Sequence, residues 1–136
     1  MSPVPPLIAV VDDDAFVCKA LQRLLRSAGF AVETYSSGSE FLEAIRSHTP
    51  DCVVLDLHMP EVNGFEVQAQ LARDGSRIPA VVITGHDTPE SRARAMRNGA
   101  SAYICKPVDD MALLEAINAA TSGRVPGSFG RERPGQ

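Results

Sequence analysis

The chain has 136 residues, of which 44% are hydrophobic and 22% charged, so it fits one globular domain and excludes a second full one. Its net charge is −4, and residues 1–121 carry 16 acidic against 10 basic side chains, which disfavours direct binding to nucleic acid. There is no apolar run near the roughly 20 residues that span a bilayer, and no basic secretory start, so we expect a cytoplasmic protein without a membrane segment.

Five apolar runs of strand length recur along the chain. They cover residues 7–11, 30–35, 52–55, 80–83 and 102–105. The first, third and fourth runs are continuously apolar rather than alternating, which is typical of parallel strands covered by helices on both faces. The sequence therefore predicts a parallel sheet with two buried faces.

Helical periodicity fills the intervals between the first three runs. After Asp14 an apolar stripe continues to a glycine at position 29, which is placed as a helix C-cap. Its members are Val17, Ala20, Leu21, Leu24, Leu25 and Ala28. Ser37 and Glu40 have the spacing of a capping box, which predicts a second helix that Pro50 stops.

Three further helices are predicted in the second half of the chain. One runs from Gly64 to about position 73, and one starts near Asp109. Between them a helix begins at Thr88, with proline in its first turn, and ends at positions 98–99. The apolar anchors of this helix are only Ala93, Ala95 and Met96. Because they are few, we expect it to be the most mobile helix.

Five strands alternating with five helices predict a doubly wound α/β fold with right-handed crossovers. We expect an N-terminal arm over residues 1–6, one domain over 7–121, and a disordered tail or truncated linker over 122–136. Cys18, Cys52 and Cys105 are widely spaced in apolar surroundings and are expected to be buried, reduced thiols.

Polar side chains follow four of the five strand runs. They are Asp12, Asp13 and Asp14 after the first run, Asp56 after the third, Thr84 after the fourth and Lys106 after the fifth. In such a sheet ligands bind beyond the carboxyl ends of the strands. A helix N-cap accounts for one of the first three carboxylates, but not for another at the end of a different strand.

Carboxylates gathered within about 4–6 Å repel one another unless a cation lies among them. Oxygen ligands suit Mg²⁺ or Mn²⁺, whereas zinc favours Cys or His ligands that this edge does not clearly supply. His58 and His86 are near in sequence, but loop histidines usually face solvent. A magnesium ion beside an aspartate, with a hydroxyl and an ammonium opposite, can support transfer of a phosphoryl group to a carboxylate oxygen.

At these positions the sequence resembles the receiver domain of two-component response regulators. The resemblance covers about residues 7–121 and rests on four segments in a specific order. They are Val-Val-Asp-Asp-Asp at 10–14, Val-Val-Leu-Asp-Leu-His-Met-Pro at 53–60 with Gly64, Val-Ile-Thr-Gly-His at 82–86 and Tyr-Ile-Cys-Lys-Pro at 103–107. The Thr-Gly-His segment is most similar to nitrogen-fixation-type regulators. The resemblance implies a CheY-like, flavodoxin-like fold with strand order 2-1-3-4-5.

The resemblance also implies a role for each site residue. Asp56 is implied as the phosphoacceptor, Thr84 and Lys106 as partners of the phosphoryl oxygens, and Tyr103 as the aromatic that turns inward when Thr84 is drawn to the phosphate. Mg²⁺ is implied to bind Asp13, Asp56 and the backbone carbonyl of His58, with Asp12 acting largely through water. The Lys106–Pro107 bond is usually cis in this family.

The implied function is a switch rather than an enzyme. A sensor histidine kinase or a phosphotransfer protein supplies the phosphoryl group to Asp56, and the added charge biases a pre-existing equilibrium. The output is a protein-interaction face, with a homodimer through the fourth helix, fifth strand and fifth helix as one form.

Two alternatives remain open at this stage. A phosphatase of the haloacid-dehalogenase type also uses an aspartate nucleophile with threonine and lysine, in which case Asp12 attacks and Asp14 is the general acid. That family has a longer chain with a cap insertion and no need of Asp56. The second alternative is a receiver that binds partners constitutively without phosphorylation.

Overall fold

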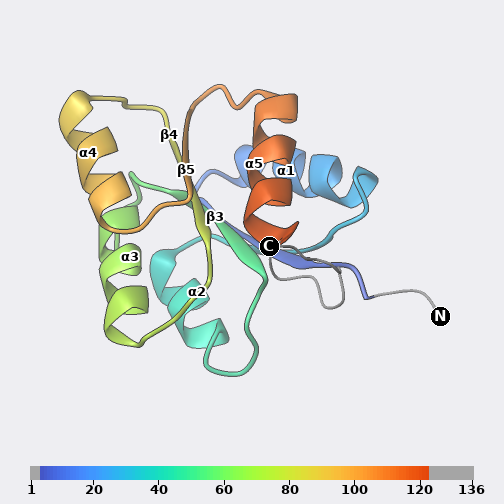
Figure 1. Cartoon of the computed structure of the whole chain (residues 1–136), viewed down its shortest axis with the longest axis horizontal. Helices are drawn as coiled ribbons and strands as arrows, with labels where there is room; N and C mark the ends of the chain where they lie inside the picture. The colour runs from blue at the N-terminus through green and yellow to red at the C-terminus, as the bar shows by residue number, and fades with distance from the viewer. Residues whose placement is uncertain (1–3, 123–136) are drawn as a thin grey trace.

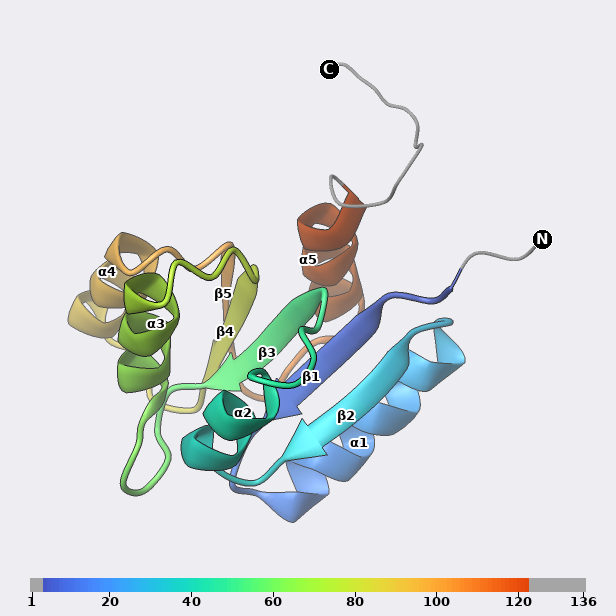
Figure 2. The ribbon, with the colours of Figure 1, turned by 90° about the horizontal axis from the view of Figure 1, so that it is seen from below.

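The computed structural model describes residues 4–122 and contains one five-stranded parallel sheet in the order β2-β1-β3-β4-β5 (Figures 1 and 2). The strands are β1 (Leu7–Val11), β2 (Ala31–Tyr35), β3 (Cys52–Asp56), β4 (Ala80–Thr84) and β5 (Ala102–Cys105). The helices are α1 (Ala15–Ser27), α2 (Gly38–Ala44), α3 (Gly64–Arg73), α4 (Pro89–Arg97) and α5 (Asp110–Ser122). The predicted fold class and strand order are confirmed.

The helices cover both faces of the sheet, as the continuous apolar runs predicted. Helices α1 and α5 lie on one face, and α2, α3 and α4 lie on the other (Figures 1 and 2). Alternate residues of β1 serve the two cores: Ile8 packs on the α1 and α5 side, and Ala9 packs on the α2 and α3 side. Because helices cover both faces of the sheet, a ligand can reach it only at the ends of the strands.

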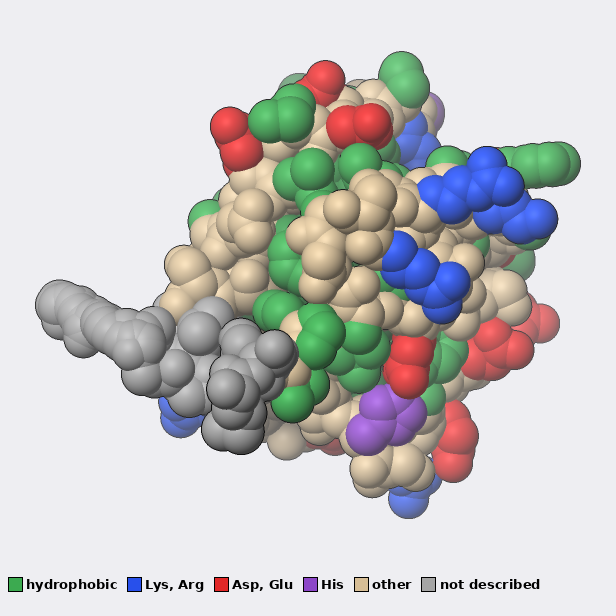
Figure 3. All heavy atoms as spheres, turned by 90° about the vertical axis from the view of Figure 1, so that its right-hand side faces the viewer, with side chains coloured by type: hydrophobic (Ala, Val, Ile, Leu, Met, Phe, Trp, Pro, Cys, Tyr) green, Lys and Arg blue, Asp and Glu red, His purple; other side chains and the backbone are tan. Residues whose placement is uncertain are grey.

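The outer side of α1 is basic. Lys19, Arg23 and Arg26 are exposed there, and lysine and arginine side chains stand out on this face of the molecule (Figure 3). Leu21 and Leu25 point into the core, whereas Ala20 is exposed although the apolar stripe included it. The buried stripe is therefore narrower than the sequence pattern.

Side-chain caps begin the predicted helices. The carboxylate of Asp14 accepts hydrogen bonds from the backbone N–H of Phe16 at 2.9 Å and starts α1. The hydroxyl of Ser37 accepts from the N–H of Glu40, but the predicted capping box is incomplete. The Glu40 carboxylate bonds to the N–H and hydroxyl of Ser36 instead, so it ties down the residue before the cap.

Other details depart from the sequence-based expectations. Strands β3 and β4 each extend one residue further, so Asp56 and Thr84 are the last strand residues rather than the first loop residues. Cys52 is buried, but Cys18 is half-buried and Cys105 is exposed, because β5 is an edge strand. The expectation of three buried thiols is therefore wrong for Cys105.

Helix α4 is weakly anchored, in line with its sequence. Within Pro89–Arg97 only Ala95 is buried, while Ala93 and Met96 are exposed. Helix α5 ends at Ser122, the last described residue, so most of the segment predicted as a tail lies outside the described residues. Within residues 4–122 the structure has no helix long and apolar enough to cross a membrane.

Gly64 provides a test of how tightly the loop after β3 is packed. An added Cβ at Gly64 would lie 2.5 Å from the backbone oxygen of Asp56 and 2.8 Å from the Cα of Leu57. Because backbone must move to relieve this contact, we expect Gly64→Ala to lower the free energy of unfolding by about 2–3 kcal/mol, measured by urea denaturation.

Gly85→Ala is the matched control for this substitution. Its added Cβ would meet only the Lys106 side chain, at an ordinary 3.7 Å, so its stability should change by less than about 1 kcal/mol. Equal effects at the two glycines would contradict the close approach of α3 to the end of β3.

Candidate functional site

Three carboxylates from two neighbouring strands meet at the carboxyl edge of the sheet. Asp12 and Asp13 follow β1, Asp56 ends β3, and each offers an oxygen within 4.8 Å of the others. Asp12 is fully buried and Asp56 is 3% exposed, whereas Asp13 is exposed. The parallel pairing of β1 with β3 brings the ends of the two strands together. The predicted grouping of these three residues is therefore present.

Lys106 places a cation among the carboxylates. Its ammonium nitrogen lies 2.9 Å from an oxygen of Asp12 and 3.4 Å from an oxygen of Asp56. The second oxygen of Asp12 accepts the backbone N–H of Asp14 at 2.9 Å. Lys106 follows β5, and its bond to Pro107 is cis, as expected. One ammonium thus links the ends of β1, β3 and β5.

The electrostatics of the cluster are unbalanced. Burial, followed by the charge of Asp12, raises the pKa of Asp56 despite the opposing effect of Lys106. Burial disfavours the charge of Lys106, but the hydrogen bond to Asp12 and the charges of Asp56 and Asp12 together raise the pKa of its ammonium. One cation faces three carboxylates, so the site can accept further positive charge.

Thr84 supplies a buried hydroxyl at the end of β4. Its side chain is 0% exposed, and its oxygen accepts the backbone N–H of His86 at 3.0 Å. The preceding residue, Ile83, pairs in register with Asp56, so the hydroxyl lies one step beyond the carboxylate on the adjacent strand. A hydroxyl that accepts one bond can still donate its own hydrogen.

Tyr103 contacts two residues of the β4–α4 region. Its hydroxyl donates to the carboxylate of Asp87 at 3.0 Å, and the guanidinium of Arg92 lies 4.6 Å from its ring centre. Burial, then the hydrogen bond and the charge of Asp87, raise the pKa of Tyr103 to about 12. The hydroxyl is therefore a hydrogen-bond donor at physiological pH.

The remaining predicted residues occupy the rim. Asp14 lies outside the cluster and acts as the α1 cap. His58 and His86 are exposed, as expected of loop histidines. The backbone N–H of His58 bonds to Asp56 and favours the charged carboxylate. The position of the His58 carbonyl relative to a metal ion stays a prediction.

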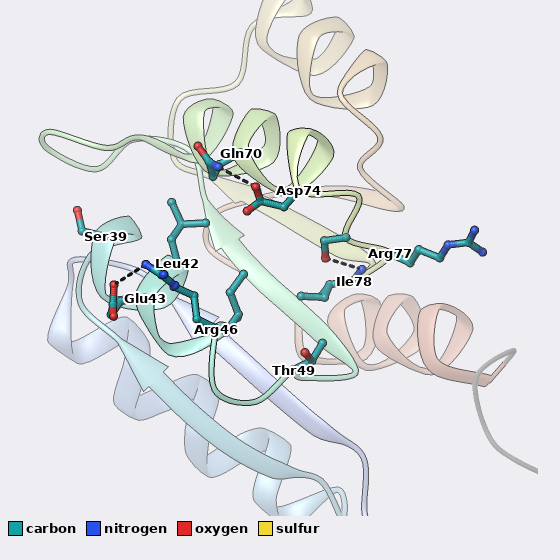
Figure 4. A pocket seen from close by; sticks show the side chains of 11 residues that line it. Ser39, Leu42, Glu43, Arg46, Thr49, Gln70, Asp74, Arg77 and Ile78 are labelled. Atoms are coloured by element: carbon teal, nitrogen blue, oxygen red, sulfur yellow. Dashed lines mark hydrogen bonds and ion pairs between the residues drawn. The ribbon is translucent and has the colours of Figure 1, made fainter.

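The cluster meets solvent at the exposed Asp13. A cavity of about 360 Å³ borders Asp12 and Asp13 and extends toward Tyr35 and Glu40. A larger groove of about 780 Å³ lies between α2 and α3, on the face of the sheet that these helices cover (Figure 4). Its lining includes Leu42, the Glu43–Arg46 ion pair and Ile78, but none of the site residues. The larger of these two cavities is therefore not the one that borders the carboxylate cluster.

The donor set suits a hard divalent cation. Three carboxylates supply oxygen ligands, which Mg²⁺ and Mn²⁺ prefer. Asp13 and Asp56 could ligate such an ion directly, because the two oxygens of Asp12 are already occupied by Lys106 and the Asp14 N–H. The residues present thus fit the ion that the sequence predicted.

Sequence reasoning did not identify the contacts that three residues make in this region. Asp87 and Arg92 hold Tyr103, and buried Gln68 donates from its amide to the carbonyl oxygen of Ala95 at 3.0 Å, joining α3 to α4. Each is a polar residue in a helix or loop whose partner is distant in sequence. No local pattern indicates such a pairing.

Comparisons with known proteins match almost the whole described chain. Residues 8–118 match the family model of the response regulator receiver domain. The response regulator protein TodT of Pseudomonas putida is 40% identical over 120 residues, which are 88% of this chain and 53% of TodT. The chain spans about half the length of the curated relatives it matches.

Solved structures give the same match. A response regulator receiver protein from Burkholderia phymatum is 46% identical, with a TM-score of 0.76 over 85% of this chain and 94% of that one. FixJ-N is 34% identical, with a TM-score of 0.82 over 92% of this chain and 98% of that one. The similarity to nitrogen-fixation-type regulators as a subgroup stays a prediction.

Removing one of the clustered charges tests the electrostatic description. In the absence of divalent cations we expect Asp56→Asn to raise the free energy of unfolding at pH 7 by about 1 kcal/mol or more, because it removes repulsion with Asp12. The raised pKa of Asp56 means that its charge opposes folding above that pKa. The gain should therefore shrink as the pH falls and the wild-type carboxyl becomes protonated.

Denaturation in a chelating buffer at several pH values measures this effect. Glu43→Gln is the control, since Glu43 is exposed and pairs with exposed Arg46, and should change stability by less than about 0.5 kcal/mol. If Asp56→Asn lowers stability at neutral pH, the charge of Asp56 is compensated and our description is wrong.

Proposed function

We propose a function for this chain on the basis of its family: it belongs to the response regulator receiver domain family. In this proposal the chain accepts a phosphoryl group on Asp56 and thereby switches a protein-interaction face. Receiver domains are signalling domains of two-component systems, and the chain shares their fold. The observation that carries the proposal is the meeting of Asp56, Lys106 and the acidic pair after β1 at one edge of the sheet.

Asp56 is the proposed nucleophile. One of its carboxylate oxygens attacks the phosphorus atom of a phosphohistidine, the P–N bond breaks, and the electron pair stays on the imidazole nitrogen. Lys106, 3.4 Å from Asp56, would pair with a phosphoryl oxygen, and Thr84 would donate its hydroxyl to another. Positioned donors of this kind stabilise the charge that spreads over the transferring group.

Asp13, Asp56 and the backbone carbonyl of His58 would hold Mg²⁺ directly, with Asp12 acting through water. When bound, the ion would offset the negative charge of the carboxylates and of the phosphoryl oxygens. The excess of carboxylates over cations in the cluster supports this assignment.

Tyr103 is the proposed switch residue. In this structure it is held by the Asp87 hydrogen bond and the Arg92 contact, which are worth about 0.5–1.5 and about 0.5–1 kcal/mol, respectively. A phosphoryl group adds about −1.5 to −2 charges and would draw the Thr84 hydroxyl toward Asp56. Together these two contacts favour the observed position of Tyr103 by an energy small enough that a change of a few kcal/mol at the site would reverse the preference.

The partners follow from this switch. A sensor histidine kinase or a phosphotransfer protein would donate the phosphoryl group, and the α4, β5 and α5 surface would bind a partner or a second copy. Arg92 and Tyr103 lie on this surface and change environment in the proposed switch.

The alternative phosphatase mechanism is disfavoured by the surroundings of Asp12. That residue would have to attack the substrate, but it is fully buried, and its two oxygens bind Lys106 and the backbone N–H of Asp14. The proposed general acid, Asp14, instead caps α1. Asp56, which that mechanism does not need, shares Lys106 with Asp12.

Acetyl phosphate tests the proposed acceptor without a kinase. We expect the wild-type chain to gain one phosphoryl group per molecule in the presence of Mg²⁺, and Asp56→Asn to gain none at the equivalent peptide, as measured by intact-protein and peptide mass spectrometry. Omission of Mg²⁺ should strongly reduce the modification. Glu43→Gln, an exposed carboxylate far from the cluster, should be modified like the wild type.

Two results would overturn the proposal. An unmodified wild-type chain would favour the constitutive binding alternative. Equal modification of Asp56→Asn at the same peptide would identify a different acceptor.

Selective labelling of tyrosine rings tests the switch. The sequence contains two tyrosines, so two ring signals are expected in an NMR spectrum, and Tyr35 serves as an internal reference. Phosphorylation should shift the Tyr103 signal. Asp87→Ala, which removes the hydroxyl partner, should move the signal of the unphosphorylated chain in the same direction.

Asp74→Ala is the control, because Asp74 bonds to Gln70 on α3 and not to Tyr103. A Tyr103 signal that is unchanged by phosphorylation, in a sample whose modification is verified by mass, would contradict the role of this residue.

A further inference from the structure

His58 and His86 form a pair at the entrance to the carboxylate cluster. Their ring centres lie 5.6 Å apart with an interplanar angle of 88°. His58 is two residues beyond Asp56 at the end of β3, and His86 is two residues beyond Thr84 at the end of β4. The loops that follow two adjacent strands thus bring two imidazole rings into contact. The sequence alone predicts only that each histidine faces solvent.

The ring nitrogens of this pair are not used by the protein. Among residues 4–122, neither ring makes a hydrogen bond or ion pair, whereas the third histidine, His48, lies 2.7 Å from the carboxylate of Glu33. Both rings are exposed and open to solvent. Unused imidazole nitrogens are ligands for first-row transition metals.

The separation of the rings matches joint coordination of one ion. A tetrahedral zinc ion binds imidazole nitrogens at about 2.0–2.1 Å, which places the centres of two coordinated rings about 5–6 Å apart. The observed 5.6 Å lies in this range. Two ligands on neighbouring loops at this separation can bind one ion together, which favours chelation over binding to a single histidine.

We propose that His58 and His86 form a binding site for a transition-metal dication of the Zn²⁺ type, with water completing the coordination. This site is distinct from the oxygen-only cluster of Asp12, Asp13 and Asp56, because the histidines are not part of that group. The nitrogen ligands select zinc-type ions, whereas the carboxylates select Mg²⁺.

Occupation of the site would connect the β3–α3 and β4–α4 loops above Asp56. The backbone N–H of His58 bonds to Asp56, and that of His86 bonds to the Thr84 hydroxyl. An ion that joins the two rings therefore restrains the loops that directly follow Asp56 and Thr84. This consequence rests on the proposed function, and we expect bound Zn²⁺ to slow phosphorylation of Asp56; the binding itself does not depend on that function.

Calorimetry with Zn²⁺ in excess Mg²⁺, which occupies the oxygen cluster, tests the site. The wild type should bind one equivalent, and both His58→Ala and His86→Ala should bind at least about tenfold more weakly, since each loses the chelate. His48→Gln and Cys105→Ser should bind like the wild type. The latter control covers the exposed thiol. NMR of the ring nitrogens should show shifts at positions 58 and 86 but not at 48.

The outcomes separate this proposal from the proposed function. Binding that survives in both alanine variants, or that is lost in Cys105→Ser, overturns the histidine site. Histidine-dependent binding, together with no phosphorylation of the zinc-free chain in the presence of Mg²⁺, supports the site and contradicts the receiver function. Phosphorylation at an unchanged rate with Zn²⁺ bound overturns the proposed restraint of the loops.

Discussion

The repulsion among buried carboxylates is the constraint on which this structure depends. Asp12 and Asp56 lie in a nearly water-free position, and Asp13 offers a third oxygen nearby. Burial and the Asp12 charge together raise the pKa of Asp56. A sheet edge of this kind is tolerated because Lys106 bonds to both buried carboxylates, and it gains from any further positive charge. The same imbalance that opposes folding therefore prepares the site for a cation.

The doubly wound topology makes this arrangement possible. Parallel strands end at the same edge, so residues 12, 56, 84 and 106 become neighbours although they span most of the chain. Their strands are held by cores on both faces, which fix the backbone positions of the site residues. The side chains at the edge can therefore be polar without weakening the packed layers beneath them.

The sequence predicts the strands and helices of this fold better than the side-chain contacts between them. Continuous apolar runs indicate the parallel sheet, and Asp56 and Lys106 are noticeable because they directly follow apolar runs. Exposure of Cys105 could not be read from an apolar run, since it depends on β5 being the sheet edge. The contacts of Tyr103 with Asp87 and Arg92, and of His58 with His86, join separate elements. Such pairings depend on tertiary distances that no local period encodes.

Helix α4 connects the site to the outer surface, and its anchors constrain how it can move. Its buried contacts come from Ala95, whose carbonyl oxygen accepts the amide of buried Gln68. Leaving that amide unpaired in the core would cost about 1–3 kcal/mol, as much as the contacts that hold Tyr103. Toward the other end of the helix, Arg92 rests on Tyr103, with both groups accessible to water. In the proposed switch, a displacement of α4 that preserves the Gln68 bond would therefore be larger near Pro89 than near Ala95, so the helix would pivot at its buried end.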